Sequence, residues 1–124
     1  MSARILFVED DETFAQLVAD VLRAAGFEIV VAPSYREALD VIERPTEIVD
    51  LLLTDIVMPN GVNGFALARM ARVRREGLRV LHITGYDVPT NEASGKVIRK
   101  PIANDELVRE IRASLAEPLA STGP

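Results

Sequence analysis

Short apolar runs alternate along the chain with stretches in which apolar residues recur at helical spacing. Five runs, at residues 5–8, 27–31, 51–53, 80–83 and 97–98, predict strands. The run at 5–8 is apolar throughout, as a strand that is buried on both faces requires. Apolar positions three and four residues apart predict a helix after four of these runs, all but the one at 80–83. The pattern therefore predicts a βα unit repeated five times.

Polar residues and glycines mark where these helices begin and end. Asp11 stands at the N-cap position of the first helix, and Gly26 follows its last apolar turn. Ser34 and Glu37 form a capping box at the start of the second helix. Asn104 is predicted to cap the last helix.

Short βα connections require right-handed crossovers, which predicts a doubly wound α/β fold with a five-stranded parallel sheet and helices on both faces. Residues 86–92 contain a proline and show little helical periodicity. We therefore expect the helix between the fourth and fifth strands to be short, displaced or absent. We expect one domain over residues 1–116 and a short flexible tail over 117–124.

Composition narrows the classes of function. The 124 residues suit one domain, and the net charge of −5 argues against nucleic-acid or anionic-membrane partners. The absence of cysteine excludes disulfides and thiolate metal sites. No apolar run approaches the roughly 20 residues that span a bilayer. Because a strand-like run begins at residue 5, we expect no signal peptide. We expect a cytoplasmic protein.

Polar residues follow four of the predicted strands: Glu9 and Asp10 the first, Asp55 the third, Thr84 the fourth and Lys100 the fifth. Ligands of parallel α/β sheets bind beyond the carboxyl ends of the strands, so these groups should converge. Two carboxylates about 5 Å apart repel by roughly 3 kcal/mol at an effective dielectric constant near 20, which favours a cation between them. Oxygen ligands favour Mg²⁺, and the set suits phosphoryl transfer with Asp55 as nucleophile.

Each of these residues also has a simpler interpretation. Residues 9–11 could be a strand end with a helix cap, Asp55 a turn residue and Lys100 a solvated charge. Only their placement at successive strand ends makes the pattern specific. His82, inside an apolar run, is interpreted as a core residue. The run of Arg72, Arg74 and Arg75 is interpreted as a solvated helix face.

Four segments, at residues 8–11, 53–59, 83–85 and 99–101, together resemble the signature segments of the receiver domain of two-component response regulators. The resemblance extends over residues 4–115. It implies a flavodoxin-like fold with strand order 2-1-3-4-5, the order known for this family. It also implies Asp55 as phosphoacceptor, with Thr84 and Lys100 binding the phosphoryl group.

The resemblance further implies a Mg²⁺ ion, for which Mn²⁺ can substitute. Its ligands would be Asp10, Asp55 and the backbone carbonyl of Val57, with Glu9 acting through water. The protein would be a single-domain response regulator, not an enzyme beyond its own phosphorylation and dephosphorylation. It would accept a phosphoryl group from a histidine kinase, a hybrid kinase or a histidine phosphotransfer protein, and switch protein contacts or relay the group. We expect a monomer that binds neither nucleic acid nor membrane.

Several positions depart from the family pattern. Val97 stands three residues before the lysine, where the family has Tyr or Phe, so the usual coupling between threonine and aromatic ring is not expected. Thr84 and Lys100 are only 16 residues apart, and the loop at 59–64 is one residue longer than is common. Val57 and Tyr86 would flank the phosphoryl group. Since Val57 cannot orient an attacking water, we expect slow self-dephosphorylation.

Three other functions fit parts of the pattern. A Mg²⁺-dependent phosphohydrolase would also use Asp55, but such enzymes often have an acid where this chain has Val57, and it would turn over small phosphate esters. A flavodoxin-like cofactor module is disfavoured because residues 9–11 would repel a phosphate. A degenerate interaction domain is disfavoured by the intact acidic set.

Overall fold

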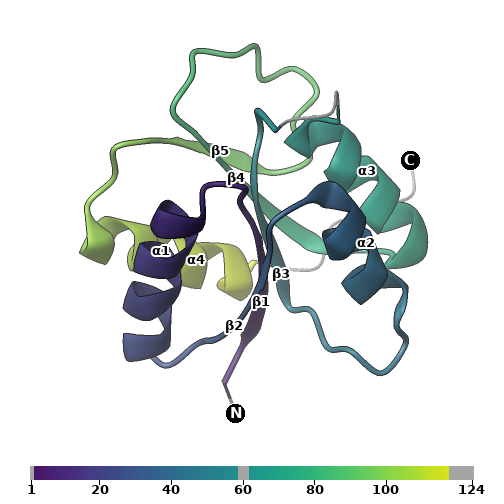
Figure 1. Cartoon of the computed structure of the whole chain (residues 1–124), viewed down its shortest axis with the longest axis horizontal. Helices are drawn as coiled ribbons and strands as arrows, with labels where there is room; N and C mark the ends of the chain where they lie inside the picture. The colour runs from purple at the N-terminus through teal and green to yellow at the C-terminus, as the bar shows by residue number, and fades with distance from the viewer. Residues whose placement is uncertain (1, 59–61, 118–124) are drawn as a thin grey trace.

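The computed structural model describes residues 2–58 and 62–117, which form alternating strands and helices (Figure 1). In chain order the elements are β1 (Arg4–Val8), α1 (Glu12–Ala24), β2 (Glu28–Ala32), α2 (Tyr35–Glu43), β3 (Leu51–Asp55), α3 (Gly64–Arg74), β4 (Arg79–Thr84), β5 (Lys96–Arg99) and α4 (Asn104–Ala116). All five predicted strands are present, with boundaries shifted by one or two residues at most.

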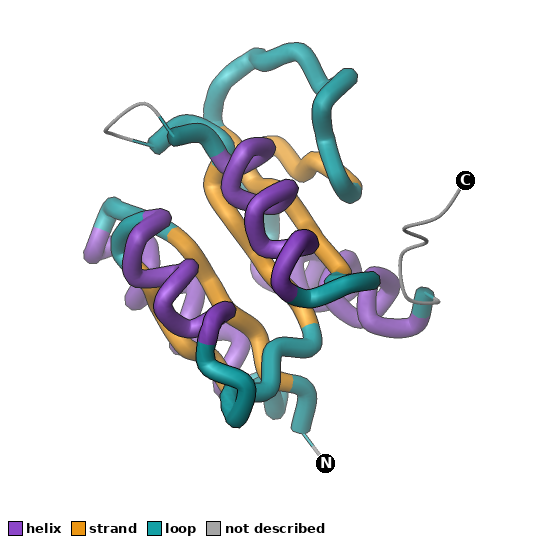
Figure 2. Tube along the Cα trace, turned by 90° about the vertical axis from the view of Figure 1, so that its right-hand side faces the viewer, coloured by secondary structure: helices purple, strands orange, loops and turns teal. Residues whose placement is uncertain are grey.

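The five strands form one parallel sheet in the order β2-β1-β3-β4-β5, which confirms the predicted fold and strand order. Helices α1 and α4 cover one face, and α2 and α3 cover the other (Figure 1). The view turned by 90° shows α2 and α3 in front of the strands (Figure 2). The fold is therefore three-layered, and the carboxyl ends of the central strands lie at one edge of the sheet.

Each face of the sheet has its own apolar core, because alternate residues of a strand point to opposite faces. Ile5 and Phe7 of β1 pack with the α1 and α4 side, whereas Leu6 and Val8 pack with the α2 and α3 side. Every residue of β3 is buried. A central strand buried on both faces explains why its sequence is continuously apolar up to its polar end.

The helix starts confirm two of the three predicted caps. The Asp11 side chain accepts a hydrogen bond from Phe14 N at 3.0 Å, and Ser34 Oγ accepts one from Glu37 N at 3.2 Å. The prediction for Asn104 was wrong. Asn104 is the first residue of α4, and Ala103 precedes it in an extended conformation without a side-chain cap. The helix thus begins one residue earlier than predicted. Two acidic residues in its first turn lie near the positive end of the helix dipole.

The chain passes from β4 to β5 through residues 85–95, all of them described, without forming a helix. This confirms the prediction of a short or absent helix here. The connection lies close against β4, since a Cβ at Gly95 would overlap the carbonyl oxygen of Val80. Ser94 N donates a 3.4 Å hydrogen bond to Nε2 of His82, which is fully buried as predicted.

The three arginines at the C-terminal end of α3 were predicted to be a solvated face, and this is wrong for two of them. Arg72 Nε donates to the carbonyl of Leu78, and Arg75 donates to carbonyls at the end of α2, among them that of Arg44 at 2.8 Å. Arg74 is exposed and pairs with Glu43. All of the partners at the end of α2 lie more than 30 residues away in the sequence, so helical periodicity does not reveal them.

Two predictions fall partly outside the described residues. The loop at 59–64 includes residues 59–61, and the tail at 117–124 includes residues 118–124, so the lengthened loop and the flexible tail stay predictions. In the described part of the chain, no helix combines the length and the apolar character needed to cross a membrane.

Candidate functional site

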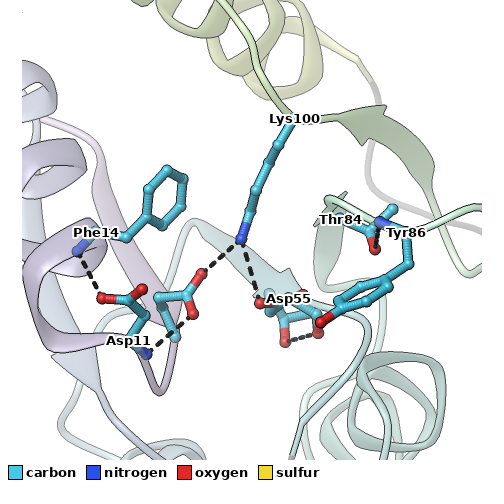
Figure 3. Close-up of polar contacts among 8 residues, drawn as sticks. Asp11, Phe14, Asp55, Thr84, Tyr86 and Lys100 are labelled. Atoms are coloured by element: carbon cyan, nitrogen blue, oxygen red, sulfur yellow. Dashed lines mark hydrogen bonds and ion pairs between the residues drawn. The ribbon is translucent and has the colours of Figure 1, made fainter.

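The polar residues singled out in the sequence come together at the carboxyl edge of the sheet (Figure 3). The register explains why: Val8 of β1 pairs with Thr54, and Asp55 of β3 pairs with Ile83, directly before Thr84. Parallel strands in this register end at the same level. The residues that end or follow β1, β3, β4 and β5 therefore share one site.

Three carboxylates form a compact acidic cluster there. One oxygen from each of Glu9, Asp10 and Asp55 lies within 4.8 Å of the other two. Glu9 and Asp55 are buried, with 2% and 6% of their surface exposed, whereas Asp10 is exposed. At this separation each pair of anions repels by roughly 3 kcal/mol at an effective dielectric constant near 20. Oxygen donors with this much negative charge fit a hard divalent cation such as Mg²⁺.

Lys100 supplies the positive charge nearest to these acids. Its Nζ donates to Glu9 Oε1 at 3.0 Å and to Asp55 Oδ2 at 3.4 Å. Burial by itself lowers the pKa of Lys100, but the hydrogen bond to Glu9 and the charge of Asp55 outweigh it and raise the pKa. The side chain extends from the end of β5 toward Asp55, as Figure 3 shows. The ammonium is therefore charged and bridges the two buried acids.

Glu9 differs from an ordinary surface glutamate. Burial raises its pKa to about 7, even though hydrogen bonds from Asp11 N and from Lys100 favour the ionised form. The backbone N–H of Asp11 donates to Glu9 Oε2 at 3.1 Å. Both oxygens of Glu9 thus have protein partners, which suits a residue that holds the site together and reaches a cation only indirectly.

Asp55 combines burial with an unused oxygen. Its Oδ1 is buried and has no hydrogen-bond partner within the described residues, while Oδ2 faces Lys100. A buried carboxylate oxygen without a partner is costly unless an ion or a reacting group satisfies it. The acidic cluster around Asp55 thus fits a divalent cation, and Oδ1 of Asp55 is the oxygen left without a protein partner.

Thr84 and Tyr86 lie beside Asp55 (Figure 3). Thr84 is buried, and its Oγ1 accepts a hydrogen bond from Tyr86 N at 3.1 Å. Val57 and Tyr86 are 42% and 61% exposed. Val97 lies in β5, paired with His82 of β4.

Two contributors were not recognised as site residues in the sequence. A Cβ at Gly64 would overlap the carbonyl oxygen of Asp55, so only glycine lets α3 start this close to the site. Phe14 is one of the apolar residues in the first turn of α1, and its ring centroid lies 4.1 Å from Lys100 Nζ. No sequence signal marks either contact, because both depend on how distant elements pack.

Comparison with known proteins is consistent with this geometry. The family model described as "Response regulator receiver domain" matches residues 5–112. The DNA-binding response regulator MtrA of Mycolicibacterium paratuberculosis is 35% identical over 123 residues, which cover 93% of this chain and 52% of MtrA. The chain thus spans about half the length of this curated relative.

Two solved structures are similar. The receiver domain of the hybrid histidine kinase CckA is 34% identical, with a TM-score of 0.79, and the match covers 91% of this chain and 99% of that one. The response regulator TrrA of Thermotoga maritima, solved in complex with Mg²⁺-BeF, is 27% identical, with a TM-score of 0.76 and coverage of 90% and 98%. Fold, strand-end residues and family match agree: the chain belongs to the response regulator receiver domain family.

Proposed function

We propose that this receiver accepts a phosphoryl group on Asp55 from a phosphohistidine of a histidine kinase, a hybrid kinase or a histidine phosphotransfer protein. The observation that carries the proposal is the unpartnered, buried Oδ1 of Asp55 beside two further acids and the ammonium of Lys100. The membership in a family of phosphoacceptor signalling domains supports it.

The transfer is a single displacement. An oxygen of Asp55 attacks the phosphorus, the bond from phosphorus to the imidazole nitrogen breaks, and its electron pair stays on the imidazole. Lys100 then pairs with an oxygen of the new acyl phosphate, and the hydroxyl of Thr84 donates to another. Catalysis here consists of positioning and charge neutralisation.

The charges require a further cation. Glu9, Asp10 and Asp55 carry three negative charges when ionised, and Lys100 compensates one of them. Mg²⁺, with Mn²⁺ as a substitute, would be held by Asp10, Asp55 and the backbone carbonyl of Val57, with Glu9 reached through water. When bound, the ion neutralises charge that develops on the transferring oxygens. The Mg²⁺-BeF complex of TrrA supports this assignment.

The added charge is the signal. An acyl phosphate brings acceptor oxygens and about −1.5 to −2 charge near pH 7, which favours a new arrangement of Thr84 and of the connection 85–95 behind it. Because β5 has Val97 where the family has an aromatic residue, we infer that the response passes through this connection rather than through an inward-turning ring. The readout is a change in affinity for a protein partner or onward transfer to a histidine.

Phosphorylation on Asp55 is tested with acetyl phosphate and Mg²⁺, followed by intact mass and fragmentation. Wild type should gain one phosphoryl group, and Asp55→Asn none. Asp40→Asn, which changes an exposed carboxylate of α2, is the matched control and should behave as wild type. An unmodified wild type, or modification that persists in Asp55→Asn, contradicts the proposal. Sustained phosphate release from small phosphate esters would instead indicate a hydrolase.

We further propose that the regulator is a single-domain protein, and this predicts its mass in the cell. An antibody raised against this chain should detect a protein of about 13.6 kDa in the source cell. A larger band would show a receiver joined to a further domain, as the length of MtrA illustrates.

A further inference from the structure

The ammonium of Lys100 has a third close neighbour besides the two carboxylates. Its Nζ lies 4.1 Å from the centroid of the Phe14 ring, compared with 3.0 Å from Glu9 Oε1 and 3.4 Å from Asp55 Oδ2. A cation within about 6 Å of an aromatic ring centroid, over the ring face, is attracted by the ring quadrupole. The ring is thus a partner of the ammonium, from an element that carries none of the reacting groups.

The position of this ring is well defined by its surroundings. The backbone N–H of Phe14 donates to the N-cap residue Asp11 at 3.0 Å. The ring packs edge-on against Phe7, with centroids 6.5 Å apart and planes at 65°. Phe7 is fully buried in β1, two residues before Glu9. The β1–α1 connection therefore places the ring and the acids in one rigid arrangement.

We propose that Phe14 is a positioning residue for phosphoryl transfer to Asp55, acting through the ammonium of Lys100; this rests on the function proposed above. The Lys100 side chain is 23% exposed, so water competes with the site for its charge. The ring offers the ammonium an attractive surface beside Asp55 that does not compete for the incoming phosphoryl oxygens. It keeps the ammonium next to the position that an oxygen of the phosphoryl group will take.

Phosphorylation by acetyl phosphate needs no partner protein, so its rate reports the effect of Phe14 on the transfer alone. An oxygen of Asp55 attacks the phosphorus, the bond between phosphorus and the acetate oxygen breaks, and acetate leaves with the electron pair. Lys100 stabilises the charge and transfers no proton. Cation–π attractions of the usual strength correspond to between about 2-fold and 30-fold in a rate. For a partly exposed ammonium we expect about 3-fold to 10-fold.

The test replaces Phe14 by phenylalanines carrying one, two and three fluorine atoms. Fluorine withdraws electron density from the ring face with little change in size, so a purely structural role is nearly unaffected. The rate of phosphorylation by acetyl phosphate with Mg²⁺ should fall stepwise along the series, to about one third to one tenth for the trifluoro variant. Phe14→Leu should be at least as slow.

Phe27 provides the matched control, because its ring also faces a cation but lies away from the site. The guanidinium of Arg112 is 5.8 Å from its centroid. The same fluorine series at Phe27 should leave the rate unchanged. A flat series at Phe14, a rate that rises with fluorination, or an equal fall at Phe27 overturns the proposal.

A second readout does not depend on phosphorylation. The chain has only two lysines, so the ammonium signal of Lys100 can be followed by NMR, with Lys96 as internal reference. Exchange of the Lys100 ammonium protons with water should quicken along the Phe14 series while that of Lys96 stays constant. A wild type that is never phosphorylated on Asp55 would refute the function. Phosphorylation that is insensitive to fluorination, with unchanged exchange, would refute only the role of Phe14.

Discussion

The substitution Lys100→Met tests whether one ammonium holds two buried acids together. Met matches the apolar stem of lysine as far as the ε position but removes the ammonium that lies 3.0 Å from Glu9 and 3.4 Å from Asp55. Removing one partner of a buried ion pair costs about 3–5 kcal/mol, because the remaining charges lose their compensation. Since Lys100 is 23% exposed, we expect the lower end, about 3 kcal/mol.

The loss of stability in Lys100→Met should depend on pH and on bound metal. Burial gives Glu9 a pKa of about 7, so at pH 6 a proton already neutralises it at little cost and the loss should be smaller than at pH 8.5. A divalent cation should replace the missing charge. Added Mg²⁺ should therefore stabilise Lys100→Met more than wild type.

The assay is urea unfolding in EDTA at pH 8.5 and pH 6, repeated with Mg²⁺. In a parallel thermal unfolding experiment, a loss of about 3 kcal/mol should lower the melting temperature by about 10 °C for a domain of this size. Lys96→Met is the control, because Lys96 is exposed and pairs with Glu110 at the surface, where a pair contributes about 0–1 kcal/mol. If Lys100→Met is as stable as Lys96→Met at pH 8.5, Lys100 does not compensate the acids and the reasoning fails.

Two further predictions concern pH and phosphoryl lifetime. Burial, with the charge of Arg72, lowers the pKa of His82 from 6.5 to about 4, so between these values the unfolded state binds more protons and stability falls as the pH drops. In urea unfolding from pH 7 to pH 4, wild type should lose about 3 kcal/mol more stability than His82→Gln. The raised pKa of Glu9 acts in the opposite direction but equally in both proteins, so the difference isolates His82, and parallel curves would contradict this. Val57→Asn should shorten the phosphoryl half-life several-fold, measured as loss of the added mass, because an amide can orient the attacking water that valine cannot. A wild-type half-life of seconds that is unchanged in the variant would refute slow self-dephosphorylation.

Local signals in the chain were enough to place most elements. Asp11 and Ser34 cap their helices as predicted, since a cap depends on residues only three positions apart. The proline-containing segment after β4 led to the expectation of a short, displaced or absent helix, and no helix forms there. Asn104 was misassigned because the extended residue before a helix need not carry a capping side chain, and Ala103 fills that place.

The sequence alone determined the order of strands and helices, the apolar faces, and which polar residues end the strands, because these follow from periodicities of two and about 3.6 residues. Only the tertiary structure decided which of those residues touch. Lys100 meets Glu9 across 91 positions, Phe14 faces the same ammonium, and Gly64 lies against the backbone of Asp55. Such contacts depend on strand register and helix packing, which bring together residues whose spacing in the chain carries no periodic signal.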